Sequence, residues 1–356
     1  MTSSQDFESQ RPMLAELCQR LKELKIDDPL ELASTRVRLL GEHDVYKWFV
    51  PVDFGGFGWS PTQLVQGYLE LSSACLSSAF VLTQRSGAVS RIASSPNEDL
   101  KADLLPKLAK GEVFCTVGIS HLTTSHRHLK QPALLAEKVQ NGFQLKGFSP
   151  WVTGVSLADS VVVGASFADG TEALLHVRCD QSGVERPQTP QLVALSDSCT
   201  GEFRLNDVFV DKSQLVAGPA ENIMTQGTGG STGGLQTSTL AVGLARAAIE
   251  YIEEQTSIRG GYDLPAGHLR DQWDATFEYL MGVASKKDGH SNEQLRSQAN
   301  SLVLRATQAA LMIAKGAGYR DDHPVGRWCR EALFFLVWSC PQPVAESNLC
   351  ELAQIS

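Results

Sequence analysis

The sequence predicts an α+β fold in which a helical domain, a β domain and a helical bundle follow one another along the chain. Residues 1–112 repeat apolar side chains at three- and four-residue steps. Residues 113–218 instead contain short runs of β-branched and aromatic residues, separated by turn signals such as Gln-Asn-Gly. Residues 219–356 return to long helical periodicity. We therefore expect an N-terminal helical domain, a middle antiparallel β-barrel or sandwich, and a C-terminal helical bundle.

Three segments define the expected N-terminal helices. Residues 13–24 are amphipathic, residues 61–84 are long and largely apolar, and residues 97–112 close the region with another amphipathic pattern. A turn punctuated by glycines, residues 51–59, lies between the first two. We expect the helix at 61–84 to be buried on most sides, because it has little polar face.

The C-terminal region contains four segments with helical periodicity, which are residues 235–259, 272–287, 292–319 and 326–338. Apolar stripes on helices of this length favour a bundle. The last segment resembles the end of a long apolar helix that breaks at Cys340-Pro341. The glycine-rich residues 227–234 lack both the Walker lysine and the GxGxxG spacing, so a linker is favoured over a phosphate-binding loop.

Composition indicates a soluble globular protein, with 42% hydrophobic and 20% charged residues. The net charge of −9 argues against partners such as nucleic acid or an anionic membrane surface. The N-terminus lacks the pattern of a signal peptide, and no eighteen-residue apolar run is present, so we expect a cytoplasmic protein. The eight cysteines show no metal-ligand spacing and are interpreted as reduced core thiols, with no metal site.

Three strings resemble the acyl-CoA dehydrogenase family of flavoproteins. PVDFGGFGWS (51–60) is similar to the family's Pro-x-x-x-Gly-Gly-x-Gly turn. AVGLARAAIEYIEEQTSIR (241–259) resembles the helix that opens the family's C-terminal bundle and ends in an arginine. GAGYRDDHPVGRWCREA (316–332) is similar to the segment that ends in Arg-Asp-Ala. The resemblance implies FAD as cofactor, a small-molecule substrate such as an acyl-CoA, an electron acceptor that the sequence does not identify, and a homodimer or homotetramer.

The resemblance also implies residues for the flavin site. FSPWVTGVSLADSVVVGA (148–165) is similar to the family's Lys-x-Trp-Ile-Thr stretch, which assigns Trp151 to the face of the isoalloxazine ring and Thr153 to a hydrogen bond near its N5 atom.

The resemblance assigns residues from two further parts of the chain to the expected cofactor site. In the upstream loop, Ile119, Ser120 and Ser125 fall at the positions of the family's Thr-Glu and motif serine, although Thr123 and Thr124 replace its glycines. Arg259 matches the arginine that binds the adenosine diphosphate part of a neighbouring subunit's flavin. The histidines of this loop, including His121, are interpreted as surface or wall residues rather than as a base.

The catalytic base is not identified, because both family locations lack a carboxylate. Counting nine residues from Arg330 places Ser339 at the usual glutamate, and the alternative location falls at Gly233. Three hypotheses remain open on this evidence. The chain is a flavin dehydrogenase with its base elsewhere, a flavin monooxygenase of the same fold that needs no such base, or a non-catalytic member that binds a ligand or partner.

Overall fold

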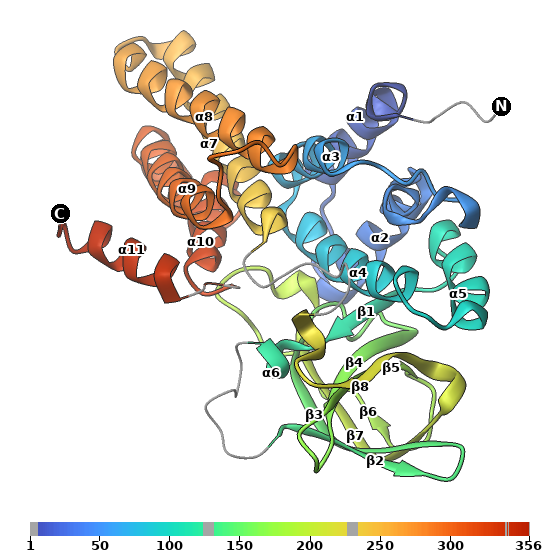
Figure 1. The fold of residues 1–356 in the computed structure, drawn as a ribbon. Helices are drawn as coiled ribbons and strands as arrows, with labels where there is room; N and C mark the ends of the chain where they lie inside the picture. The colour runs from blue at the N-terminus through green and yellow to red at the C-terminus, as the bar shows by residue number, and fades with distance from the viewer. Residues whose placement is uncertain (1–5, 124–131, 226–233, 339, 341, 356) are drawn as a thin grey trace.

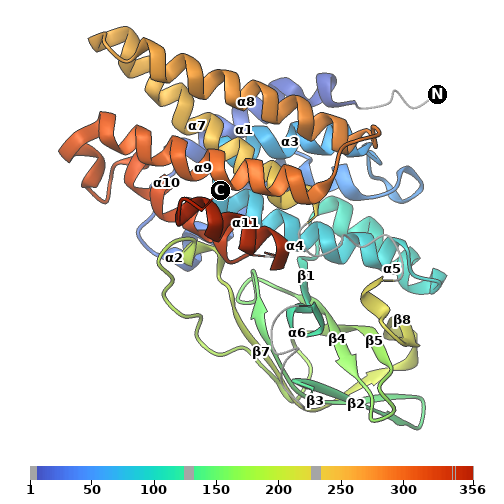
Figure 2. The same ribbon diagram turned by 60° about the vertical axis from the view of Figure 1, so that its left-hand side comes forward.

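The computed structural model describes residues 6–123, 132–225, 234–338, 340 and 342–355 (Figure 1). Helices at both ends of the chain lie on one side of a β-sheet region (Figure 2). The helix α4 (Leu76–Ala93) contacts both the strand β1 (Cys115–Gly118) and the helix α7 (Leu235–Arg259). Ser125, Gly233 and Ser339 lie outside the described residues. Within the described part of the chain, no helix combines the length and the apolar character that crossing a bilayer requires.

The N-terminal region is helical, as predicted, and most of its helices begin with a side-chain cap. Asp6, Asp28 and Asn97 each accept a hydrogen bond from the backbone of the first turn, and Ser60 forms a capping box with Gln63. The elements are α1 (Phe7–Glu23), α2 (Pro29–Glu42), η1 (Val45–Phe49), η2 (Val52–Phe54), α3 (Pro61–Ala74), α4 (Leu76–Ala93) and α5 (Glu98–Lys110).

The expectation of one helix over residues 61–84 was wrong. The chain leaves the helical conformation at Cys75, whose φ of −156° and ψ of 103° are extended, so that α3 and α4 are separate helices. The hydroxyl of Ser72 donates to the carbonyl of Tyr68 at 2.7 Å. Such back-bonding by serine competes with the backbone hydrogen bonds of a helix and is compatible with the end of α3 two residues later.

The middle region forms one eight-stranded sheet with the order β6-β7-β3-β2-β4-β5-β8, and β1 pairs with β4. The strands are β1 (Cys115–Gly118), β2 (Leu134–Val139), β3 (Gly142–Val152), β4 (Ser160–Ser166), β5 (Glu172–Arg178), β6 (Val184–Glu185), β7 (Gly201–Asp211) and β8 (Leu215–Ala220). The predicted Gln-Asn-Gly turn joins β2 to β3, with Asn141 at a φ of 61°.

The three-part fold class is as predicted, but the sheet is mixed rather than antiparallel throughout. Both β1 and β2 pair with β4 in the parallel sense, whereas the other strand pairings of the described residues are antiparallel. Parallel strands need a crossover connection, and the connection from β1 to β4 contains α6 (Ser120–Thr123), β2 and β3. Strand-like runs separated by turn signals do not reveal this crossover, because it contains two antiparallel strands of its own.

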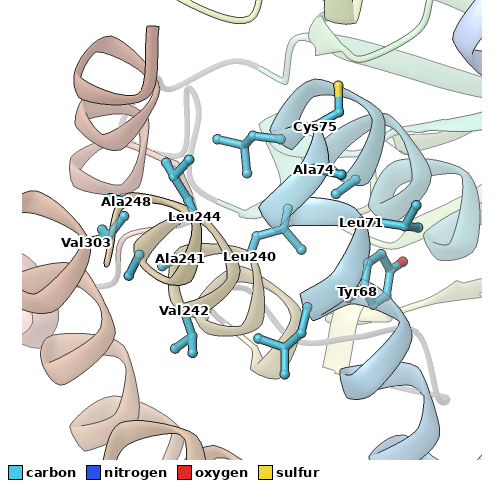
Figure 3. Packing of buried hydrophobic residues seen from close by; sticks show 14 of the residues in the cluster. Tyr68, Leu71, Ala74, Cys75, Leu240, Ala241, Val242, Leu244, Ala248 and Val303 are labelled. Atoms are coloured by element: carbon cyan, nitrogen blue, oxygen red, sulfur yellow. The ribbon is translucent and has the colours of Figure 1, made fainter. Parts of the chain in front are cut away.

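The C-terminal region is a bundle centred on α7, as predicted. Its elements are α7 (Leu235–Arg259), α8 (Asp263–Ala284), α9 (Asn292–Ala314), η6 (Lys315–Tyr319), α10 (Pro324–Ala332), η7 (Leu333–Leu336) and α11 (Gln342–Leu352). Leu240 and Leu244 of α7 lie toward α3, and Val303 lies on α9 across the opposite side of α7 (Figure 3). Gly243 allows a close approach, because a Cβ atom there would overlap the hydroxyl of Ser72. The bundle and the N-terminal helices therefore share one core.

The last apolar helix ends earlier than the sequence indicated. The α-helix stops at Ala332, and Leu333–Leu336 continue as a 3₁₀ turn rather than as α-helix up to Cys340. Arg296 of α9 donates to the carbonyls of Phe335 at 3.1 Å and Trp338 at 2.7 Å. These bonds satisfy carbonyl groups that a helix end leaves without partners, so a neighbouring helix stabilises the early termination.

Candidate functional site

Trp151 lies at an irregularity of β3 and presents half of its side chain to solvent. The pairing of β3 with β7 shifts between Ser149 and Val152, which leaves Trp151 out of the regular ladder. Its relative exposure is 52%, although most other aromatic residues of the chain are more buried. An exposed indole beside a bulge provides a flat apolar face for a planar ligand.

Thr153, two residues further on, ends a chain of buried hydroxyl groups. The hydroxyl of Thr200 donates to that of Thr153 at 3.1 Å, and the oxygen atoms of Ser198 and Thr200 are 2.7 Å apart. Because Thr200 uses its hydrogen toward Thr153, Ser198 must donate to Thr200. Among the described residues, this leaves the hydroxyl hydrogen of Thr153 without an acceptor, so it can donate to a bound group.

Ile119 and Ser120 follow β1, which ends against β3. A Cβ atom on Gly118, the last residue of β1, would lie 3.1 Å from the hydroxyl of Ser149 and from Val152. Ile119 follows directly and is half-buried, and Ser120 begins α6. The assignment of Ile119 and Ser120 to the same site as Trp151 stays a prediction.

The loop that contains Ile119 and Ser120 is fixed to β4. A ring nitrogen of buried His121 lies 2.7 Å from the carbonyl oxygen of Gly164. Leu122 packs at the same position, because a Cβ atom on Gly164 would overlap its side chain. His121 is therefore a buried wall residue of the sheet, which agrees with its interpretation from the sequence.

Arg259 is not brought to Trp151 within one chain. It ends α7, whose 25 residues span about 37 Å, and Figure 1 shows α7 starting beside the sheet and ending at the far tip of the bundle. The exposed guanidinium of Arg259 donates to the carbonyl of Ile313 at 3.2 Å. Any ligand that contacts both Trp151 and Arg259 would need the arginine of a second copy.

An aromatic cluster surrounds the residues that precede position 339. Trp338 stacks on Phe334 with ring centroids 5.2 Å apart, and Phe80 of α4 meets Trp338 edge-on at 4.8 Å. Phe80 is buried and the other two rings are half-buried. Sequence reasoning missed this cluster, because Phe80 and Trp338 are distant in the chain. Phe334 and Trp338 therefore pack against an apolar part of α4.

Burial shifts the pKa values of several titratable groups in the β region and the bundle. It lowers the pKa of Arg296 to about 10 and raises the pKa of the Cys115 thiol, on β1, to about 11. Desolvation also raises the pKa of Glu331 on α10, against the opposing effects of Arg327 and Arg36. No group of three His, Cys, Asp or Glu side chains that could hold a metal ion occurs among the described residues.

The three regions of the chain can be compared with known proteins. A helical domain, a mixed sheet with an exposed tryptophan and a helical bundle follow one another along the chain. Residues 11–112 match the model of the "Acyl-CoA dehydrogenase, N-terminal domain" family. Over these residues the chain is therefore similar to the acyl-CoA dehydrogenase family.

Comparisons with known proteins extend over nearly the whole chain. The glutaryl-CoA dehydrogenase of Desulfococcus multivorans is 23% identical over 343 residues, which cover 89% of this chain and 86% of that protein. The structure of butyryl-CoA dehydrogenase from Megasphaera elsdenii superposes with a TM-score of 0.78 at 18% identity and covers 99% of both chains. A glutaryl-CoA dehydrogenase from Mycobacterium smegmatis in complex with FADH2 gives a TM-score of 0.79 at 18% identity, over 98% of this chain and 95% of that one. These structures share the acyl-CoA dehydrogenase fold with this chain.

Proposed function

We propose that this chain is an FAD-dependent oxidoreductase of the acyl-CoA dehydrogenase type, which acts on a CH–CH bond of an acyl-CoA or related substrate. The observation that supports it best is the pair formed by Trp151 and Thr153. An exposed indole and a hydroxyl with a free hydrogen lie two residues apart, which suits a large planar ring with polar ring atoms.

In this proposal the chain's residues hold and orient the cofactor. Trp151 covers one face of the ring, and Thr153 donates a hydrogen bond to a ring atom near N5. Ile119 and Ser120, together with Ser125, contribute from the loop after β1. When bound, FAD supplies the acceptor for the hydride that leaves the substrate.

The cofactor tail is completed by a second copy of the chain. Arg259 lies at the tip of the bundle, where exposed apolar side chains surround it: Ile258 at the end of α7, Leu264 at the start of α8 and Met312 near the end of α9. Leu264 and Met312 are exposed by 85% and 80% in a single chain. Burying them between copies would give a homodimer or homotetramer and place Arg259 at a neighbour's cofactor.

The base remains the open part of the proposal. Ser339 occupies the location of the family's glutamate, and a serine hydroxyl is a poor base without a partner that accepts its proton. Under the dehydrogenase hypothesis, Ser339→Glu should create or raise acyl-CoA dehydrogenation. Ser339→Gln, which has a similar size but no carboxylate, is the matched control and should not.

The serine at position 339 also favours a second candidate, a flavin monooxygenase of the same fold, because that chemistry needs no base for an α-proton. Anaerobic addition of acyl-CoA to the FAD-loaded protein separates the two. Bleaching of the flavin absorbance supports the dehydrogenase. Absence of bleaching at every chain length, with oxygen consumption once an external reductant is added, supports the monooxygenase. A protein that ignores FAD contradicts both and leaves a non-catalytic binding role.

A further inference from the structure

A polar cavity of about 200 Å³ lies at the junction of the three regions, apart from the candidate flavin site. Arg36 of α2 lines it from the N-terminal region, and residues 192–197 line it from the β region. Arg327, Arg330 and Glu331 of α10 line it from the bundle. These residues are separate from those proposed to bind the flavin.

The charges of the cavity do not balance. Arg36 forms an ion pair with Asp197, and Ser77 donates to the same carboxylate at 2.8 Å. The Nε atom of Arg327 lies 3.5 Å from an oxygen of Glu331. Two carboxylates are therefore matched by two guanidinium groups, and the half-buried guanidinium of Arg330 has no ion pair or hydrogen bond with any described residue.

A second donor in the cavity also lacks a partner. Arg36 is only 8% exposed, and its Nε atom is buried with no hydrogen-bond partner in the part of the chain that the structure describes. Buried polar groups are nearly always hydrogen-bonded, so an unmatched one calls for a ligand or a water molecule. Unpaired guanidinium donors from two separate regions thus border one space.

The wall formed by residues 192–197 is held in an unusual conformation. Leu195 and Cys199 flank η3 (Ser196–Ser198) and both have positive φ angles, of 62° and 49°. Such angles are uncommon for residues other than glycine and are retained where the surroundings enforce them. Asp197 lies between them and is tied to Arg36, so this geometry keeps the cavity wall in place.

We propose that this cavity binds a small oxoanion, a carboxylate or a phosphate group, held by Arg330 and by the Nε atom of Arg36. The guanidinium fork pairs naturally with either group. The volume is below the roughly 300 Å³ at which sites for drug-sized molecules begin, so the anion has few heavy atoms. Because its two donors belong to α2 and α10, the anion joins the N-terminal region to the bundle.

Isothermal titration of the purified full-length chain tests this proposal, with inorganic phosphate in one arm and malonate in the other. Sodium chloride keeps the ionic strength constant, so that general salt effects cancel. We expect saturable binding of one or both anions with one site per chain. Binding of phosphate alone identifies a phosphate site, and binding of malonate alone identifies a carboxylate site.

Three variants locate the site. Arg330→Gln should raise the dissociation constant at least tenfold, and Arg330→Lys, which keeps the charge but not the fork, should raise it by a smaller factor. Arg320→Gln makes the same charge change on an exposed side chain outside the cavity and should bind as the wild type does. If Arg330→Gln does not fold, the dissociation constant of Arg330→Lys is compared with that of the wild type instead. The proposal is overturned if neither anion binds saturably to the wild type, or if changing Arg330 leaves the affinity unaltered.

Discussion

Replacing Thr200 by valine would cut the hydroxyl chain that supports Thr153. Valine keeps the shape of threonine, so the substitution removes the hydroxyl with little change in packing volume. The side chains of Ser198 and Thr153 are 0% and 4% exposed, so water cannot replace the lost partner freely. The Ser198 hydroxyl loses its acceptor, and the Thr153 hydroxyl loses the bond that orients it.

The expected loss of stability and of FAD affinity follows from the two hydrogen bonds that Thr200→Val removes. A buried hydroxyl without a partner costs about 1–3 kcal/mol, and the methyl group that valine adds returns up to about 0.8 kcal/mol. We expect the free energy of unfolding to fall by about 1–2 kcal/mol. Because a neutral hydrogen bond contributes about 0.5–1.5 kcal/mol, the dissociation constant for FAD should rise roughly two- to twelvefold if Thr153 no longer points its hydrogen at the ring.

Urea denaturation and a fluorescence titration with FAD measure the two effects. Thr171→Val is the matched control, because the Thr171 hydroxyl bonds to Asp169 in an exposed turn, and its removal should change stability by less than about 0.5 kcal/mol. If Thr200→Val behaves like Thr171→Val in both measurements, the hydroxyl chain does not support the candidate site.

Three other predictions concern separate parts of the molecule. Trp151→Ala should leave the free energy of unfolding within about 0.5 kcal/mol but weaken FAD binding roughly two- to twelvefold, as loss of ring stacking implies, whereas Phe209→Ala on the same sheet should not affect FAD. Because burial raises the pKa of Glu331, the folded chain binds its proton more tightly than the unfolded chain, and this stabilisation is lost as pH rises through the folded pKa. In urea titrations, the stability of Glu331→Gln relative to wild type should therefore increase as pH rises above the ordinary range of a glutamate, whereas that of the exposed Glu278→Gln should stay constant. Met312→Glu should shift the assembly toward monomers in light scattering, and a wild-type monomer would contradict the shared cofactor site.

Sequence periodicity predicted the helices well where one face is apolar and capped, as in α1 and α5. It failed at Cys75, because an apolar run carries no mark of the extended backbone conformation that separates α3 from α4. It also missed the direction of β1, because the parallel pairing of β1 with β4 joins segments that are separated in sequence by α6, β2 and β3. Local patterns therefore gave the element types, whereas strand direction depended on contacts between distant segments.

The candidate site likewise contains residues that local sequence patterns predicted and residues that they could not predict. Trp151 could be proposed because its neighbours in sequence resemble a family motif, and the structure shows it as an exposed side chain at an irregularity of β3. Thr200 could not be proposed, because it lies 47 residues from Thr153 in the sequence. Its hydroxyl reaches that of Thr153 only when β3 pairs with β7. The cavity around Arg330 was missed for the same reason, since its lining comes from four separate parts of the chain.

The absorbance spectrum of the purified chain during titration with FAD tests the central claim most directly. The account predicts a yellow protein, or a colourless one that takes up FAD to one flavin per chain with the visible spectrum of a bound flavin. A chain that remains colourless through the titration, while circular dichroism shows it to be folded, would contradict the assignment of Trp151 and Thr153 to a flavin site.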